Sequence, residues 1–153
     1  MVIGTWHFSF TVRNLERSLE FYQGLLGMEL VHRQEQGGGY TDRLVGMQDV
    51  WLKAAMLKFP GQDAGVSGHV LELIEYVRPQ GTPVDLRTCN PGVAHMAFVV
   101  EDIHKEYERL KAHGVQFKSE PVAITGGRNK GGWAVYLLDP DGITPELFQP
   151  PPR

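Results

Sequence analysis

The stretches HFSFTVRNL (7–15) and HMAFVVEDI (95–103) carry a histidine, a phenylalanine and a valine at the same relative positions. A second similarity lies near the end of each half of the chain, where Glu72 lies in LELIEY and Glu146 lies in PELFQP. Each half therefore begins with a histidine on a strand-like run and ends with a glutamate on another. This pattern indicates that the chain was built by duplication.

The first half predicts one helix among several strands. Residues 5–13 are rich in Phe, Thr and Val and alternate as a strand does. Asn14 is the expected cap of a helix that ends at Gly27. The apolar face of this helix is formed by Leu15, Leu19, Tyr22 and Leu26. Further strands are predicted at 28–33, 50–59 and 69–77, with Gly37, Gly38 and Gly39 in a loop or hairpin turn.

The second half repeats this order. A strand at 94–100 leads into a helix of about ten residues that begins at 102, with Asp102 as its cap. Its apolar face carries Ile103, Tyr107 and Leu110, and Gly114 ends it. The remaining predicted strands lie at 115–118, 133–138 and 143–149, with a glycine-rich loop at 125–132. Each half is therefore expected to be a βαβββ module.

The organisation predicted from these modules is one α+β domain. Module one covers residues 1–77 and module two covers 92–153, joined by a Pro-, Gly- and Thr-containing linker at 78–91. Neither half can cover a sheet alone, so we expect the two to form one curved mixed sheet around a cleft. Inward-facing residues on the first and last strands of both halves would converge there.

Composition narrows the class of partner. The net charge is −3 and no long basic run exists, which argues against nucleic acid and anionic membranes as partners. No apolar run approaches the ~18 residues of a transmembrane helix, and no charged leader precedes the first strand. The single cysteine, Cys89, excludes an internal disulfide and favours a reducing, cytoplasmic location.

His7, Glu72, His95 and Glu146 form a candidate metal site because the duplication places them at matching positions. Two imidazoles and two carboxylates suit one divalent ion of Zn, Ni, Co, Mn or Fe, and do not suit Cu(I) or an iron–sulfur cluster. A lone histidine on a strand is more often structural than a ligand. A glutamate between two leucines, however, needs a cation or strong donors if it is buried.

These residues resemble the vicinal oxygen chelate superfamily, which includes glyoxalase I, methylmalonyl-CoA epimerase, extradiol dioxygenases and bleomycin resistance proteins. The similarity spans almost the whole chain and is most specific in HFSFTVRNLERSLEFYQGLLGMEL, GVAHMAFVVEDI and LLDPDGITPELFQP. It implies paired βαβββ modules, a homodimer, and metal ligands at His7, Glu72, His95 and Glu146.

The resemblance leaves the activity open. The ligand set looks like that of glyoxalase I, but Thr11 stands where that enzyme typically carries an arginine that helps to hold glutathione. The epimerase usually has Gln at the position of Glu72 and a glutamate base on the strand that reads WLKAAMLKF here. Extradiol dioxygenases have no ligand at the position of Glu72, and the antibiotic-binding members lack the metal set.

The expected function is a metal-dependent isomerase, epimerase or lyase that acts on a small carbonyl or carboxylate-bearing substrate. Substrate would chelate the ion through two neighbouring oxygens, and Glu146 or Glu72 would act as general base. Arg128 and Lys130 would clamp a substrate anion, and Trp133 would line the pocket, although a solvated loop and a core aromatic are the commoner roles. The alternatives are an Fe(II)-dependent dioxygenase and a small-molecule binding or antibiotic-resistance protein.

Overall fold

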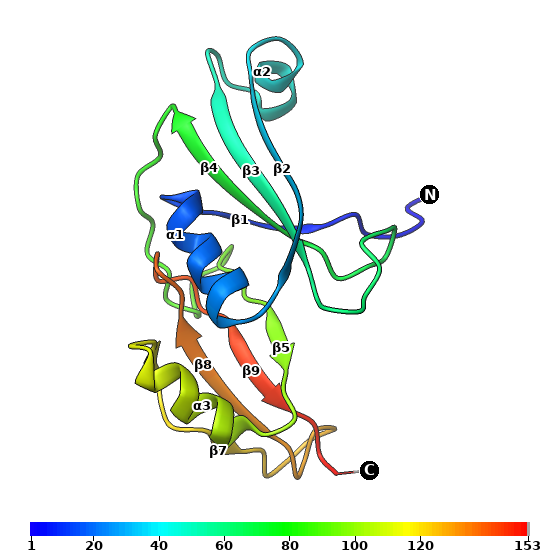
Figure 1. Cartoon of the computed structure of the whole chain (residues 1–153), viewed down its shortest axis with the longest axis vertical. Coiled ribbons are helices and arrows are strands. Elements are labelled where there is room, and N and C mark those ends of the chain that lie inside the picture. The colour runs from blue at the N-terminus through cyan, green and yellow to red at the C-terminus, as the bar shows by residue number, and fades with distance from the viewer. Residues whose placement is uncertain (153) are drawn as a thin grey trace. The chain divides into compact units, whose positions relative to one another are not determined.

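The computed structural model describes residues 1–152 and divides the chain into two compact units, Met1–Pro83 and Val84–Arg153 (Figure 1). The boundary falls inside the segment 78–91 that the sequence indicates as a linker. The predicted α+β class with mixed sheets is confirmed, and each unit contains one sheet. The sequence predicted a single sheet, whereas the hydrogen bonds between strands form two separate sheets.

The first unit contains four strands. Its elements are β1 (Phe8–Thr11), α1 (Leu15–Leu19), the π-helical turn η1 (Glu20–Leu25), β2 (Glu29–Gly37), α2 (Gly39–Val45), β3 (Trp51–Lys58) and β4 (Leu71–Arg78). The strand order is β1-β4-β3-β2, in which β1 and β4 run parallel and the other neighbours are antiparallel. A parallel pair brings the starts of two strands together, which matters for the site described below.

The first helix begins where the sequence predicts. The Asn14 side chain accepts a hydrogen bond from the backbone N–H of Arg17 at 2.9 Å. Such a cap satisfies one of the N–H groups that a helix leaves unpaired at its start. Gly27 follows with a φ of 74°, a left-handed conformation that favours glycine.

The helix α2 was not predicted from the sequence, which indicated a loop or hairpin turn at its glycines. Instead β2 continues to Gly37. Gly38, which precedes α2, and Gly39, its first residue, adopt positive φ values of 60° and 52°. The Asp42 carboxylate then accepts hydrogen bonds from the N–H groups of Asp49 and Val50. A helix of seven residues is too short for its apolar spacing to stand out in the sequence.

The second unit repeats the first with small changes. Its elements are β5 (Ala97–Val99), α3 (Ile103–Ala112), β6 (Gln116–Phe117), β7 (Val122–Ala123), β8 (Trp133–Leu138) and β9 (Glu146–Gln149). The sheet order is β5-β9-β8-β6, and the unpredicted short strand β7 also pairs with β8. Asp102 caps α3 as predicted, accepting from the N–H of Lys105 at 3.0 Å.

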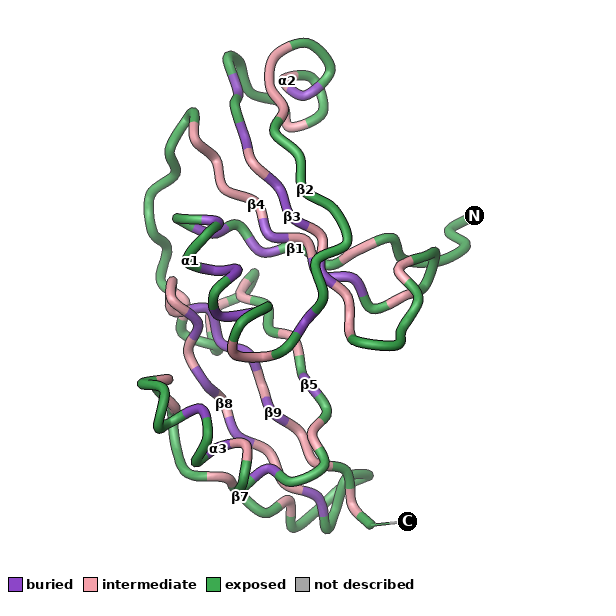
Figure 2. The backbone as a smooth tube through the Cα atoms, viewed as in Figure 1, coloured by how far each residue is buried: buried purple, intermediate pink, exposed green. Residues whose placement is uncertain are grey.

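In the first unit α1 covers one face of the sheet, and in the second unit α3 does so. In each unit the core lies between that helix and the sheet. Figure 2 shows the buried positions on these elements. In the first unit the fully buried residues include Leu15, Tyr22, Leu57, Leu71 and Leu73; in the second they include Ile103, Leu110, Leu137 and Leu147. Burial of such side chains is worth about 1.5–3 kcal/mol each and fixes which face of each strand turns outward.

None of the helices in residues 1–152 has the length and apolar character that crossing a lipid bilayer requires. The homodimer and the cytoplasmic location stay predictions.

Candidate functional site

The first unit brings His7 and Glu72 together. His7 directly precedes β1 and Glu72 is the second residue of β4, and the parallel register pairs Ser9 with Glu72. The two side chains meet with His7 Nε2 at 3.2 Å from Glu72 Oε2, and they are 33% and 14% exposed. They therefore form a pair that a small molecule can still reach.

The second unit repeats this pair with His95 and Glu146. The register of β5 and β9 matches Ala97 with Glu146, so the glutamate again lies opposite the residue two positions after the histidine. His95 Nε2 lies 3.2 Å from Glu146 Oε2, and the side chains are 41% and 18% exposed. The internal repeat of the sequence thus corresponds to a repeat in the structure. In each unit a histidine–glutamate pair lies on a pair of parallel strands.

Both glutamates lie on the sheet face that the helix does not cover. On β4 the neighbours Leu71 and Leu73 are fully buried, whereas Glu72 between them points to the other face. Leu147 is likewise buried beside Glu146. Because successive side chains of a strand alternate between faces, the helix-packed core determines the direction of each glutamate.

The separation within each pair suits two ligands of one divalent ion. Ligand atoms that lie about 2.0–2.2 Å from a shared ion at ordinary coordination angles are about 3.0–3.4 Å apart. The observed nitrogen–oxygen distances of 3.2 Å fall in this range. Within residues 1–152 no group of three or more His, Cys, Asp or Glu side chains gathers as a metal site. Each unit presents two of the four predicted ligands, and their assignment to one ion stays a prediction.

Two further residues lie on the same faces: Met56, which the sequence suggested as a pocket residue, and Tyr136, which the sequence did not suggest. Met56 pairs with Glu72 across β3 and β4, and Tyr136 pairs with Glu146 across β8 and β9. The Tyr136 ring also contacts the ring of His95 edge-on, with centroids 5.3 Å apart. Strand alternation would have placed both residues on these faces, but the register that sets them beside the glutamates is a tertiary feature.

The predicted substrate-binding residues lie in different environments. Arg128 and Lys130 are exposed in the loop that joins β7 to β8. Trp133 faces the helix side of β8, where its ring contacts His104 of α3 with centroids 4.6 Å apart. It thus lies on the opposite face of β8 from Tyr136 and Glu146, so the structure does not bring Trp133 to the histidine–glutamate pair.

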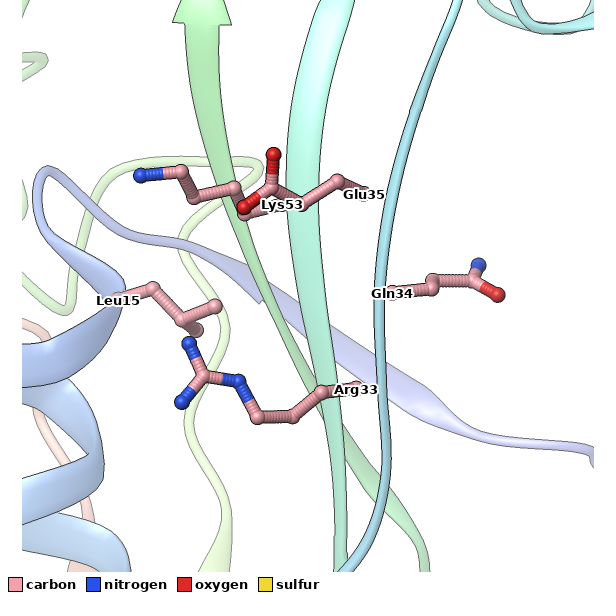
Figure 3. A pocket seen from close by; sticks show the side chains of 5 residues that line it. All are labelled: Leu15, Arg33, Gln34, Glu35 and Lys53. Carbon is pink, nitrogen blue, oxygen red and sulfur yellow. The ribbon is translucent and has the colours of Figure 1, made fainter.

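A shallow depression of about 240 Å³ in the first unit is separate from the pair (Figure 3). It is lined by Leu15, Arg33, Gln34, Glu35 and Lys53. In Figure 3 the Gln34 side chain projects from β2 away from Arg33 and Lys53, which point toward α1. A hydrogen bond with Glu16 raises the pKa of Arg33, which remains a cation on the helix side. The depression therefore lies on the face opposite Glu72.

Comparison with known proteins identifies the family. Residues 5–147 match the model of the glyoxalase/bleomycin resistance protein/dioxygenase superfamily. The chain belongs to this superfamily. It is 30% identical to a 2-epi-5-epi-valiolone epimerase of Actinomyces sp over 97% of this chain and 80% of that protein. It is 27% identical to the lactoylglutathione lyase GLX1 of Arabidopsis thaliana over 94% of this chain, and spans only 43% of that protein.

The solved structures agree on the fold. A glyoxalase family protein of Bacillus cereus superposes with a TM-score of 0.79 at 23% identity, covering 99% of this chain and 97% of that one. The relatives of the present chain by sequence thus carry the names of a lyase and an epimerase. The fold of the chain is that of the glyoxalase family.

Proposed function

We propose that this member of the superfamily is a divalent-metal-dependent isomerase, epimerase or lyase that acts on a small carbonyl compound. The observation that carries the proposal is the repeated histidine–glutamate pair, with the same 3.2 Å separation in both units. The names of the relatives, an epimerase and a lactoylglutathione lyase, support the same reaction class.

His7, Glu72, His95 and Glu146 would hold the ion. When bound, a divalent ion supplies Lewis-acid polarisation of a substrate oxygen. Each glutamate has one carboxylate oxygen, Oε2, beside its histidine, which leaves Oε1 to accept a proton from carbon. Glu146 or Glu72 would serve as this base. The histidines would orient the glutamates.

The experiment combines elemental analysis with proton exchange in D2O. The purified protein is analysed for metal and then incubated with 2-epi-5-epi-valiolone and with the glutathione hemithioacetal of methylglyoxal. We expect about one divalent ion per chain and deuterium incorporation at the carbon beside the carbonyl in one of the two substrates. Metal-free protein that gains no activity with Zn, Ni, Co, Mn or Fe would overturn the proposal.

The same preparation separates the two alternatives. Oxygen consumption with a catechol in the iron-loaded protein would indicate an Fe(II)-dependent dioxygenase instead. Ligand affinity that survives His7→Ala and Glu146→Ala in metal-free protein would indicate a binding or resistance protein, since sequestration needs no ion.

A further inference from the structure

A chain of hydrogen bonds runs along the exposed strand β2 and is not explained by the proposed metal chemistry. His32 Nε2 donates to Gln34 Oε1 at 3.2 Å, and Gln34 Nε2 donates to Gln36 Oε1 at 3.0 Å. The hydroxyl of Tyr40, at the start of α2, donates to the same Gln36 oxygen at 2.7 Å. We call these residues, His32, Gln34, Gln36 and Tyr40, the polar strip.

The polar strip lies on the same sheet face as Glu72. The register matches His32 with Met56 on β3, and Met56 with Glu72 on β4. Neighbouring strands are about 4.8 Å apart, so the backbone of His32 lies about 10 Å from that of Glu72. Figure 3 shows the Gln34 side chain directed away from the helix-side residues of the same strand. A ligand held at Glu72 would therefore extend across Met56 toward the strip.

The floor between Glu72 and the strip is apolar. Leu52 and Ala54 are buried, and Ile74 and Tyr76 pack against them together with Val45 of α2. The half-buried Met56, Ile74 and Tyr76 therefore offer the apolar contact surface, and the row of polar groups lies along one edge of it. Such a combination suits a ring that has an apolar body and hydroxyl substituents.

The cations that strands β3 and β4 place on this face are paired within the protein. They are Lys58 and Arg78. Lys58 Nζ lies 3.4 Å from Glu29 Oε2 and donates to the carbonyl oxygen of Gln62. Arg78 forms an ion pair with Asp49 at 2.7 Å. The polar strip itself offers amide, imidazole and phenol groups. These uncharged groups donate hydrogen bonds to hydroxyl groups and accept hydrogen bonds from them.

We infer that the polar strip recognises the hydroxyl groups of a neutral, polyhydroxylated cyclic carbonyl substrate. The inference rests on the proposed function, since it places the carbonyl end of that substrate at the His7–Glu72 pair. Both bonds at Gln36 are accepted by its Oε1, so among the bonds of residues 1–152 its amide nitrogen is left to donate to a ligand. A substrate hydroxyl would accept from this nitrogen and donate to the phenol oxygen.

The test uses two probes and one pair of variants. The neutral probe is an inosose, a pentahydroxycyclohexanone, and the anionic probe is S-lactoylglutathione. Binding is measured by titration calorimetry and by saturation-transfer NMR, on zinc-loaded and on metal-free protein. The variant is Gln34→Ala with Gln36→Ala. The matched control is Glu35→Ala, which lies between them on the opposite face of β2 and lines the helix-side depression.

We expect the wild-type protein to bind the inosose more tightly than S-lactoylglutathione. The double variant should weaken inosose binding about tenfold or more, and Glu35→Ala should change it less than about twofold. The zinc content of all three proteins should be equal. A wild-type protein that does not bind the inosose, or that prefers S-lactoylglutathione, would overturn the inference. Equal inosose affinity in the double variant and the wild type would overturn it as well.

The outcomes separate the inference from the proposed function. If zinc binds and proton exchange proceeds but the strip variants behave like wild type, the inference alone fails. If the protein binds no divalent ion and catalyses no exchange, the proposed function fails. Strip-dependent inosose binding to metal-free protein would then still support recognition of a hydroxylated ring.

Discussion

The Glu75 carboxylate accepts a hydrogen bond from the backbone N–H of Leu15 at 2.7 Å, which ties strand β4 to the first residue of α1. The second unit repeats this relationship, with Gln149 Oε1 accepting from the N–H of Ile103 at 2.9 Å. Glu75 and Gln149 each stand three residues after a candidate ligand on the same strand. Because three residues reverse the face, one strand presents Glu72 outward and anchors the helix inward.

We predict that Glu75→Ala lowers the free energy of unfolding by about 1–2 kcal/mol, because the Leu15 N–H loses its acceptor at a part-buried site. Glu75→Gln should retain most of the stability, since Gln149 performs the same role in the second unit. Urea denaturation monitored by circular dichroism measures both. Equal loss of stability in the two variants would show that the charge, rather than the acceptor, is what matters.

We predict that His7→Ala lowers zinc affinity more than the 10–100-fold that loss of a supporting group typically costs, because it removes a direct ligand. His69→Ala is the matched control. It removes an exposed imidazole just before β4, the strand of Glu72. Competition titration with a chromophoric chelator measures the affinities. Similar zinc affinities for the two variants would remove His7 from the ligand set.

We predict that Glu146→Gln abolishes proton exchange while leaving the fold intact, because the amide cannot accept a proton from carbon. The fold is monitored by near-ultraviolet circular dichroism, and exchange by NMR in D2O. Glu101→Gln, an exposed substitution in the same unit, serves as the control. Normal exchange in Glu146→Gln would transfer the role of base to Glu72 or exclude both.

We predict that Gln36→Arg changes ligand preference. The new guanidinium would stand on the Glu72 face, where the existing cations are paired with carboxylates. Affinity for S-lactoylglutathione should increase and affinity for the inosose should fall, because a charge replaces the amide that suits a hydroxyl. Calorimetry with both probes measures the change. Gln36→Glu should show the opposite effect on the anionic probe.

We predict that Asp42→Ala destabilises the protein by about 1–2 kcal/mol, since two backbone N–H groups lose their shared acceptor. These are the N–H groups of Asp49 and Val50, whose bonds hold the middle of α2 against the two residues that precede β3. Looser packing of α2 should also weaken inosose binding through Tyr40, without changing zinc affinity. Thermal unfolding and calorimetry test the two effects separately.

Local signals in the sequence were sufficient to predict the starts of α1 and α3 and the extent of β8. Asn14 and Asp102 cap their helices as predicted, and β8 runs over the predicted residues, Trp133–Leu138. Helix caps and strand alternation depend on residues a few positions apart in the chain, so they can be recognised from the sequence alone. The short helix α2 lacked such a signal and was missed.

The sequence by itself determined the duplication, the α+β class and the four candidate metal ligands, two histidines and two glutamates. These features follow from residue identity and spacing, which the sequence gives directly. Only the tertiary structure decided which residues share a face with them. The register of β2 and β3 shifts between Leu30 and His32, so simple alternation does not place the polar strip. Packing against α3 likewise turned Trp133 away from Glu146. Strand register and helix packing arise from contacts between distant segments, and a one-residue shift reverses every face that follows it.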